Sequence, residues 1–282
     1  MIGPEGELPK DAPEDAVSLE LSDLRSGTCA LVRLARTDGR TSARGLVCSG
    51  GEPVAVLDEP GVEADIESWN DAAAAGIGFE TVEPLSEWRV RLEHEQVTLE
   101  VTAEAASVPI DFDEEATAPL VRATGVHRYE QLCRVRGTLR VGAASTDIDG
   151  VGRRVHAWGA PAGAGFRSIY AVGEARAVTV AAVRPPGAEG HGSELVAAFL
   201  IRPEEPPARF EDVRVSTVYD SAGRPRTAGL ELFMPGDEYP RRVSGEAVCR
   251  PQEAGAGPFA ACFRWSFEGE SAQGGYQVAR PG

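Results

Sequence analysis

Hydrophobic and polar residues alternate along most of this chain. Between 132 and 141 the sequence reads LCRVRGTLRV, in which Cys133 and Val135 fall on one face and arginines on the other. A period of two residues is typical of a β-strand with one buried face. Segment 87–101, EWRVRLEHEQVTLEV, alternates on both sides of polar residues 94–96 and therefore predicts a hairpin.

Strand-like segments recur through the rest of the chain. Segment 213–233 predicts a second hairpin, with Gly and Pro residues in its turn. Further strands are expected at 28–35, 43–48, 168–183, 195–201, 241–250 and 260–267. The best helix candidate is the short segment 65–76, DIESWNDAAAAG, with Asp65 as N-cap and Gly76 as its end.

This scarcity of helices predicts an all-β protein of many antiparallel strands. Such sheets must close or stack to cover their edges, and 282 residues are enough for two units of this kind. The Gly-rich segment 159–165, GAPAGAG, is the expected boundary. The predicted organisation is a disordered acidic leader over 1–17, an N-terminal β domain over 18–158 and a C-terminal β domain over 159–282, packed together.

Composition removes several function classes. A net charge of −16 argues against nucleic acid or an anionic membrane as partner, because both attract basic surfaces. No apolar run approaches the roughly 20 residues that span a bilayer, and the acidic N-terminus lacks the apolar stretch of a secretory signal. Cytoplasmic localisation follows by default. Phosphate-binding glycine loops and serine-hydrolase or zinc-protease motifs are missing, so no cofactor is expected.

The cysteines are scattered through the chain. They are Cys29, Cys48, Cys133, Cys249 and Cys262, odd in number and never in CxxC spacing. A zinc site needs clustered soft ligands, and a disulfide framework needs denser pairing. The sequence therefore predicts buried structural thiols and no metal site.

Two polar stretches stand out against the alternating background: HRYEQ at 127–131 and GVGRRVHAWG at 150–159. If the second is extended, one face carries Arg154, His156 and Trp158, and the other carries Arg153, Val155 and Ala157. A face of Arg, His and Trp is unusual for a dry core and favours a ligand cavity, whereas the face with Val155 and Ala157 favours packing. The alternative is structural, with solvent-facing arginines, a core tryptophan and a neutral buried histidine.

The order and spacing of these stretches resemble the superfamily of carotenoid hydratases (hydroxyneurosporene synthases) and related two-domain lipocalin-like proteins. Its typical pattern, Gly-x-Gly-x-Arg-Asp-His-Ser-Trp-Gly, aligns with residues 150–159, and PLSEWRV at 84–90 and HRYEQ also look like this group. The resemblance implies two lipocalin-like β-barrel domains with an apolar ligand enclosed in or between them. Members hydrate polyenes or fold linear polyenes for cyclisation, decalin-forming Diels–Alderases among them. It also implies that His156 donates a proton or a hydrogen bond and that Trp158 forms a cavity wall.

Two departures from that pattern bear on the activity. Val155 stands where the family has an acidic residue, and Ala157 where it has serine. Hydration of an alkene needs a positioned acid, whereas a pericyclic reaction needs only a cavity that holds the reacting ends together. The leading prediction is therefore a cofactor-independent cyclase or isomerase, a Diels–Alderase-like pericyclase acting on an apolar polyene or polyketide-like intermediate of natural-product biosynthesis.

Eight residues make up the predicted site. The catalytic candidates are His156, Arg154 and Tyr129, and the substrate-binding candidates are Trp158, Trp88, Glu130, Gln131 and Tyr170. Two alternatives stay open. One is a hydratase or lyase in which Glu130 or Asp149 replaces the missing carboxylate, and the other is a carrier that binds an apolar ligand without chemistry. The substrate and the oligomeric state do not follow from the sequence.

Overall fold

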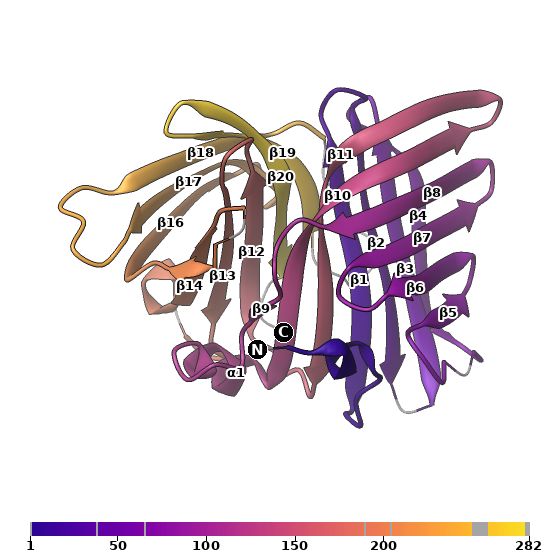
Figure 1. Cartoon of the computed structure of the whole chain (residues 1–282), viewed down its shortest axis with the longest axis horizontal. Helices are drawn as coiled ribbons and strands as arrows, with labels where there is room; N and C mark the ends of the chain where they lie inside the picture. The colour runs from indigo at the N-terminus through magenta and orange to yellow at the C-terminus, as the bar shows by residue number, and fades with distance from the viewer. Residues whose placement is uncertain are drawn as a thin grey trace.

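Two large antiparallel sheets build the molecule and curl into barrel-like halves that lie side by side (Figure 1). The computed structural model describes residues 2–37, 39–64, 66–188, 190–203, 205–249 and 259–279. The first sheet has the strand order β4-β3-β2-β1-β11-β10-β8-β7-β6-β5, with β9 paired to β10, and the second has the order β15-β14-β13-β12-β20-β19-β18-β17-β16. The all-β fold predicted from the alternation is confirmed.

The first sheet contains β1 (Glu14–Asp23), β2 (Thr28–Thr37), β3 (Arg40–Ser49), β4 (Glu52–Val62), β5 (Asp71–Ala74), β6 (Ile77–Glu83), β7 (Glu87–His94), β8 (Val97–Ala105), β9 (Ile110–Asp111), β10 (Val126–Val141) and β11 (Ala144–Gly159). The second contains β12 (Gly165–Val172), β13 (Ala177–Arg184), β14 (Leu195–Ile201), β15 (Ala208–Arg209), β16 (Asp212–Tyr219), β17 (Pro225–Phe233), β18 (Arg241–Ala247), β19 (Phe259–Phe267) and β20 (Glu270–Ala279). The short helices are η1 (Pro4–Glu7), α1 (Ala118–Thr124) and η2 (His191–Ser193). Within the described ranges, no helix has the length and apolar character needed to cross a bilayer.

Both predicted hairpins form. β7 pairs with β8 in the register His94↔Val97, with Glu95 in the turn at a φ of 51°. β16 pairs with β17 across the Gly- and Pro-containing turn. The chain leaves the first sheet at Gly159 and enters the second at Gly165, so the Gly-rich segment connects the two sheets.

The predicted helix over 65–76 does not form within the described residues 66–76, and its expected N-cap, Asp65, lies outside the described residues. Residues 71–74 are β5, which pairs with β6 at the end of the first sheet. Ala72 and Ala74 are buried and the residues between them are exposed, as alternation in a strand requires. The helix propensity of alanine is a fraction of a kcal/mol per residue, so pairing with a neighbouring strand and burial of alternate side chains outweigh it.

The N-terminal segment is attached to the first sheet and is not the free leader expected over residues 1–17. β1 already begins at Glu14, and η1 precedes it. Glu7 is buried and forms an ion pair with Arg154 of β11. Because an unpaired buried charge is costly, the two groups hold each other in place and order the segment.

β1 and the C-terminal half of β11 lie at the centre of the first sheet and are largely buried on both faces. Along β1, Val17, Leu19 and Leu21 belong to the core enclosed by the first sheet. The intervening Glu20 and Ser22 are also buried, on the opposite face, where Glu20 lies beside Gly275 and Ser22 beside Cys262 of the second sheet. Strands in this position lose the alternation of buried and exposed residues that marks a strand with one face in water.

A further apolar cluster joins the two halves. It brings Ile110, Phe112 and Leu132 of the first half together with Tyr170 and Phe199 of the second. Phe112 and Phe199 meet edge to face, with ring centroids 5.6 Å apart. This geometry is favourable for aromatic pairs and helps to fix one half on the other.

Candidate functional site

The motif 150–159 forms the C-terminal half of β11, between β1 and β10. Gly152 lies opposite Leu21 of β1 and Cys133 of β10. A Cβ atom at Gly152 would lie 2.6 Å from the carbonyl oxygen of Glu20. Glycine is therefore required here because the backbones of β1 and β11 approach closely.

The arginines and aromatic residues of the motif separate onto two faces, as the alternation predicts. On the face inside the first sheet, Arg154 Nη1 donates a 2.9 Å hydrogen bond to the Tyr129 hydroxyl. The Arg154 guanidinium also stacks over the Trp88 ring, 4.7 Å from its centroid. The structure thus brings together Arg154, Tyr129 and Trp88, three of the eight predicted site residues.

His156 lies beside them and contacts hydrogen-bond acceptors with both ring nitrogens. Nε2 is 2.7 Å from Asp15 Oδ1, and Nδ1 is 2.8 Å from the carbonyl oxygen of Gly6. A carbonyl oxygen and a carboxylate both accept, so the arrangement is satisfied when both nitrogens carry hydrogen. His156 is therefore held as a buried partner of Asp15.

Asp15 is the anionic centre of this cluster. It also accepts a 2.9 Å hydrogen bond from Trp69 Nε1 and another from the backbone N–H of Lys10. Burial by itself would raise the pKa of Asp15, but the hydrogen bond from His156 and its charge outweigh burial and lower that pKa. Asp15 is thereby favoured as a carboxylate, the form that pairs best with His156.

The N-terminal segment closes over this cluster. Glu7 pairs with Arg154, the Gly6 carbonyl accepts from His156, and the Lys10 ammonium lies 5.3 Å from the centroid of the Trp158 ring. As a result His156 and Tyr129 have no exposed surface. Burial also raises the pKa of the Tyr129 phenol, so it acts as a neutral hydroxyl. These groups are therefore closed to solvent in this structure.

The opposite face of β11 lines a large cavity between the two sheets. The cavity has a volume of about 770 Å³, within the usual range for small-molecule sites. Val155 and Ala157, for which packing was predicted, are part of its wall together with Arg153. The expectation that the face with Arg154, His156 and Trp158 lines the cavity is therefore wrong for this cavity. None of the eight predicted site residues is among the residues that line it.

The walls of this cavity are mixed in chemistry. Apolar surface comes from both sheets and from α1, and includes Leu31, Leu46, Phe112, Leu120, Val155 and Phe166. Polar surface comes from arginines, serines and carboxylates, and includes Glu14, Ser18, Glu20, Arg33, Arg128, Arg153 and Ser168. The cavity wall therefore offers both apolar contacts and hydrogen-bonding groups.

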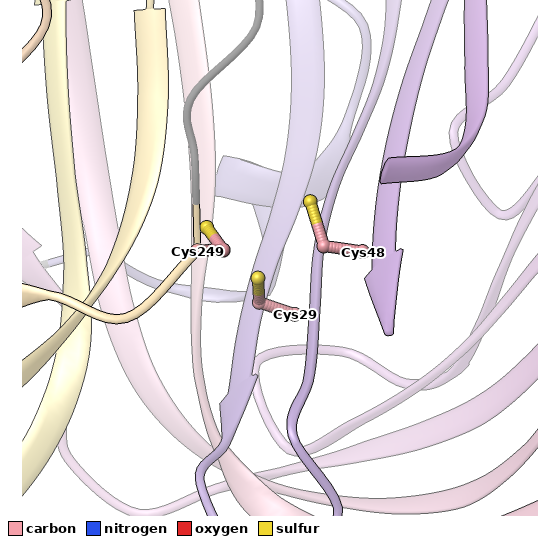
Figure 2. A group of neighbouring side chains, drawn as sticks. All are labelled: Cys29, Cys48 and Cys249. Atoms are coloured by element: carbon pink, nitrogen blue, oxygen red, sulfur yellow. The ribbon is translucent and has the colours of Figure 1, made fainter. Parts of the chain in front are cut away.

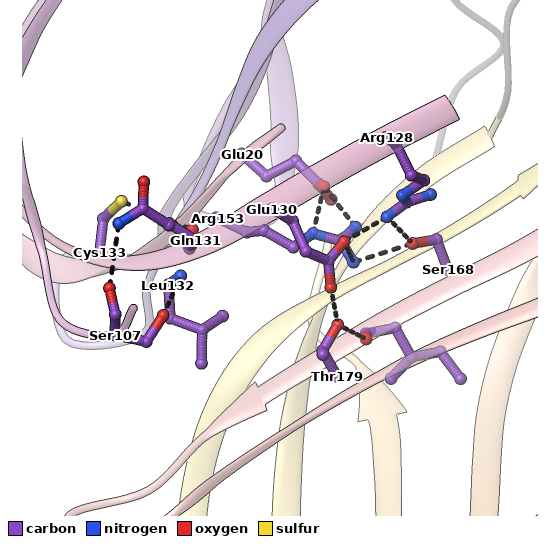
Figure 3. A network of polar contacts seen from close by, with 11 residues as sticks. Glu20, Ser107, Arg128, Glu130, Gln131, Leu132, Cys133, Arg153, Ser168 and Thr179 are labelled. Atoms are coloured by element: carbon purple, nitrogen blue, oxygen red, sulfur yellow. Dashed lines mark hydrogen bonds and ion pairs between the residues drawn. The ribbon is translucent and has the colours of Figure 1, made fainter. Parts of the chain in front are cut away.

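Arg153 links the two sheets at the polar side of the cavity (Figure 3). Its Nε donates to Glu20 Oε1 at 2.9 Å, and its Nη1 donates to Ser168 Oγ of β12 at 2.8 Å. Its guanidinium also lies 4.9 Å from the centroid of the Tyr170 ring. The guanidinium is thus fixed by side chains of both halves, because its planar group directs several N–H donors at different partners at once.

Glu130 completes this network from β10. It pairs with Arg128, accepts from the Thr179 hydroxyl of β13, and lies 3.5 Å from Arg153 Nη1. Burial would raise the pKa of Glu130, but the charges of Arg128 and Arg153 and the hydroxyl of Thr179 outweigh it and lower that pKa. Glu130 and Tyr170, predicted to bind substrate, therefore contact Arg153 in the cavity wall but do not line the cavity themselves.

The remaining predicted residues have structural partners. The Gln131 amide donates to the carbonyl oxygens of Leu85 and Ser107, each at 3.0 Å. Trp158 stacks on His127, with parallel rings and centroids 5.9 Å apart. The chemical roles assigned to the eight residues stay predictions.

Sequence reasoning missed the residues that line this cavity, Glu20 and Arg153 among them. The two lie opposite each other on directly paired strands. Local pattern contains no signal for this pair, because charged residues that alternate with apolar ones are equally typical of a face in water.

The sequence of the chain matches the profile of a protein family. The sequence profile of a domain of unknown function, DUF7064, matches residues 9–241. The chain belongs to the DUF7064 family. No curated protein sequence matches this DUF7064 member.

Several solved structures share the fold of this chain. A putative AttH from Nitrosomonas europaea superimposes with a TM-score of 0.73 at 13% identity, covering 95% of this chain and 93% of that one. Kievitone hydratase from Nectria haematococca gives a TM-score of 0.65 at 12% identity over 99% and 93% of the two chains. CghA, solved with Sch210972, gives 0.62 at 12% identity over 94% and 88%. This DUF7064 protein therefore shares its two-sheet, all-β fold with these three proteins, as the predicted resemblance implied for the fold.

Proposed function

We propose that the protein is a cyclase or isomerase that binds an elongated apolar molecule with a carbonyl-containing end in the cavity between its two sheets. The observation that carries the proposal is the cavity itself. It is large enough for a polyene or polyketide-like substrate, and β11 contributes apolar Val155 and Ala157 beside the fixed guanidinium of Arg153.

The polar side offers a donor for a substrate carbonyl. Arg128 lines the cavity, and its Nε is buried without a hydrogen-bond partner among the described residues. A buried N–H of this kind is costly unless a ligand or water accepts from it. A hydrogen bond from Arg128 to a carbonyl that conjugates with the reacting alkene would polarise the alkene, an effect comparable to that of one oxyanion-hole donor.

A cyclisation fits this lining better than a hydration does. A pericyclic step moves electrons within the substrate and needs its two ends held in near-attack geometry. Hydration needs a proton donor facing the alkene. In this wall Val155 stands where the carotenoid hydratase pattern has an acidic residue. The cavity carboxylates Glu14 and Glu20 both accept hydrogen bonds from arginines, at 2.7 Å from Arg33 and 2.9 Å from Arg153, and so act as acceptors.

A hydratase or lyase is the second candidate. Kievitone hydratase shares this fold, as does CghA, so the fold is compatible with both activities. In a hydratase, Glu14 or Glu20 would have to exchange its arginine for water or substrate during turnover. The roles predicted for His156, Arg154 and Tyr129 would require a second substrate position, inside the first sheet.

Substrate location is tested with a conjugated tetraenoic fatty acid, cis-parinaric acid, whose fluorescence rises in an apolar site. Val155→Trp introduces a bulky ring into the cavity wall beside Arg153 and is expected to weaken binding more than tenfold. Val218→Phe enlarges an exposed side chain of β16 and serves as the control, with unchanged binding expected. Binding by Val155→Trp with wild-type affinity contradicts the cavity as the substrate site, and loss of binding in His156→Ala alone would move the site to the inside of the first sheet.

The reaction is tested with small molecules released from protein purified from its own host and identified by mass spectrometry. Molecules that the protein converts to isomers of equal mass with one more ring support the cyclase. Oxygen incorporated from H₂¹⁸O identifies a hydratase, and a bound molecule that is never converted identifies a carrier; either outcome overturns the proposed activity.

A further inference from the structure

Four of the five cysteines come together at the junction of the two halves, on the side of β1 away from the first-sheet core. Cys29 of β2 and Cys48 of β3 lie directly opposite each other in the strand register. Cys249 follows β18 and Cys262 lies in β19, so the second half contributes the other two. All four are buried, as the sequence predicts, and they pack into one cluster that their spacing in the sequence does not reveal.

We propose that Cys29, Cys48, Cys249 and Cys262 bind one Zn²⁺ ion that joins the two halves of the protein. The Sγ atoms of Cys29, Cys48 and Cys249 all lie within 4.8 Å of one another (Figure 2). Four sulfurs at the Zn–S distance of about 2.3 Å form a tetrahedron with edges of about 3.8 Å. The three thiols are therefore about one ångström or less from the spacing that a single ion requires.

The proposed fourth ligand is Cys262, whose Sγ lies outside the group of three sulfurs within 4.8 Å of one another and would approach the ion on binding. Its side chain packs with those of Cys249 and Cys29 in the buried cluster, and its backbone N–H lies 3.2 Å from Cys249 Sγ. A backbone N–H directed at a ligand sulfur stabilises the thiolate that zinc binds. The Cys262 thiol itself lies 3.7 Å from the carbonyl oxygen of Leu21, and deprotonation on metal binding removes this weak contact.

The space inside the cluster suits one ion. A void of about 20 Å³ is lined by all four cysteines, together with apolar residues of both sheets and Glu20, Tyr170 and Gly275. This is the size of a single water or ion site. Apolar surroundings leave a water there few polar partners, whereas four soft thiolates supply the ligand set that zinc prefers.

The chemistry favours zinc over the other occupants of a cysteine cluster. In a [4Fe–4S] cluster each thiolate binds a different iron, and in a [2Fe–2S] cluster the four thiolates are divided between two irons, so either cluster holds the four sulfurs farther apart than one shared ion does. A disulfide between Cys29 and Cys48 would leave Cys249 and Cys262 unexplained. A buried four-thiolate site has no open position, so the ion would be structural and separate from the proposed reaction in the cavity.

The test measures metal in the intact protein. Zinc, iron and copper are quantified by inductively coupled plasma mass spectrometry after purification without chelators and with a thiol reductant. About one zinc per chain is expected in the wild type and less than 0.1 in Cys249→Ser. Cys133→Ser is the matched control, because Cys133 is buried in β10 outside the cluster, and it should keep the full zinc content.

A second measurement does not depend on variants that fold. Metal-free wild type titrated with Co²⁺ should show sulfur-to-metal charge transfer and the intense visible bands of tetrahedral coordination, saturating at one ion per chain. Chelation of zinc should lower the Tm by several degrees, and added zinc should restore it.

Four outcomes overturn the proposal. The first is a zinc content below 0.1 per chain in wild type that has been reconstituted with zinc, and the second is iron or copper as the stoichiometric metal. The third is a Co²⁺ spectrum of octahedral coordination. The fourth is an alkylation pattern that shows a Cys29–Cys48 disulfide in freshly isolated protein.

Discussion

Arg153 and Arg154 are neighbours in the chain, but their guanidinium groups lie in different compartments of the protein. Arg153 extends to the cavity between the sheets and pairs with Glu20. Arg154 extends into the first sheet and pairs with Glu7. β11 thus carries a buried ion pair on each side. The guanidinium of Arg153 also donates to Ser168 of the second half, and the pair of Arg154 holds the N-terminal segment.

Breaking the pair on the cavity side should destabilise the fold. Arg153→Met leaves the carboxylate of Glu20 buried without its partner, which is expected to lower the free energy of unfolding by about 3–5 kcal/mol. Urea unfolding followed by tryptophan fluorescence measures the change. Arg25→Met is the control, since its contact with Asp149 is 3.7 Å long and exposed, and it should stay within about 0.5 kcal/mol of the wild type.

Breaking the pair on the inner side should release the N-terminal segment. Glu7→Ala removes the carboxylate that pairs with Arg154, so residues 2–12 should exchange their backbone amides at least tenfold faster. Hydrogen–deuterium exchange with mass spectrometry detects this in N-terminal peptides. Unchanged exchange in those peptides would show that the contacts of Gly6 and Lys10 hold the segment by themselves.

Asp15 should make stability depend on pH. Its pKa is lowered in the folded protein from the ordinary 3.8, so its stabilising contribution is complete above 3.8 and is lost as the pH falls through the lowered value. Asp15→Asn is expected to cost about 1.5–3 kcal/mol at pH 7, where the charged hydrogen bonds are lost. The difference from the wild type should narrow at pH 3.

Thermal and urea unfolding at both pH values measure this difference. Asp71→Asn, at an exposed position of β5, is the control and should match the wild type at either pH. A difference between Asp15→Asn and the wild type that stays constant down to pH 3 would contradict the lowered pKa.

The glycines of the motif should be structural. A Cβ atom at Gly152 would meet the Glu20 carbonyl oxygen at 2.6 Å and Val135 Cγ2 at 2.7 Å, so Gly152→Ala should cost about 1–3 kcal/mol. Gly78→Ala is the matched control, because nothing lies within 4 Å of a Cβ atom there. Equal stability of the two variants would mean that β1 and β11 can separate without loss.

Local pattern predicted most of the strands. The hairpin of β7 and β8 followed from alternation, because its outer face meets water and its inner face meets the core. The alanine run of β5 was misassigned since its short sequence has a helical composition and its strand partner, β6, determines its conformation. The helix α1 was not predicted, because its seven residues are too few to show a helical period. Gly125 ends it in the left-handed conformation at a φ of 68°.

The candidate site was less predictable than the fold. Alternation separated Arg153 from Arg154 correctly, but both faces of β11 are buried, so the pattern alone did not show which one lines the cavity. The cysteine cluster depends on contact between β2–β3 and β18–β19, and no spacing in the sequence encodes the packing of one sheet on the other.

The pairing of β1 with β11 has a consequence for how the chain folds. Glu14 pairs with Thr37, which is close in the chain, and also with Gly159, which is far away. During synthesis β1 therefore keeps one unpaired edge until the whole first sheet has been made, and an edge of this kind invites pairing with other chains. Such a long-range closure also predicts slow refolding from denaturant, limited by the arrival of β11 rather than by the formation of the hairpins.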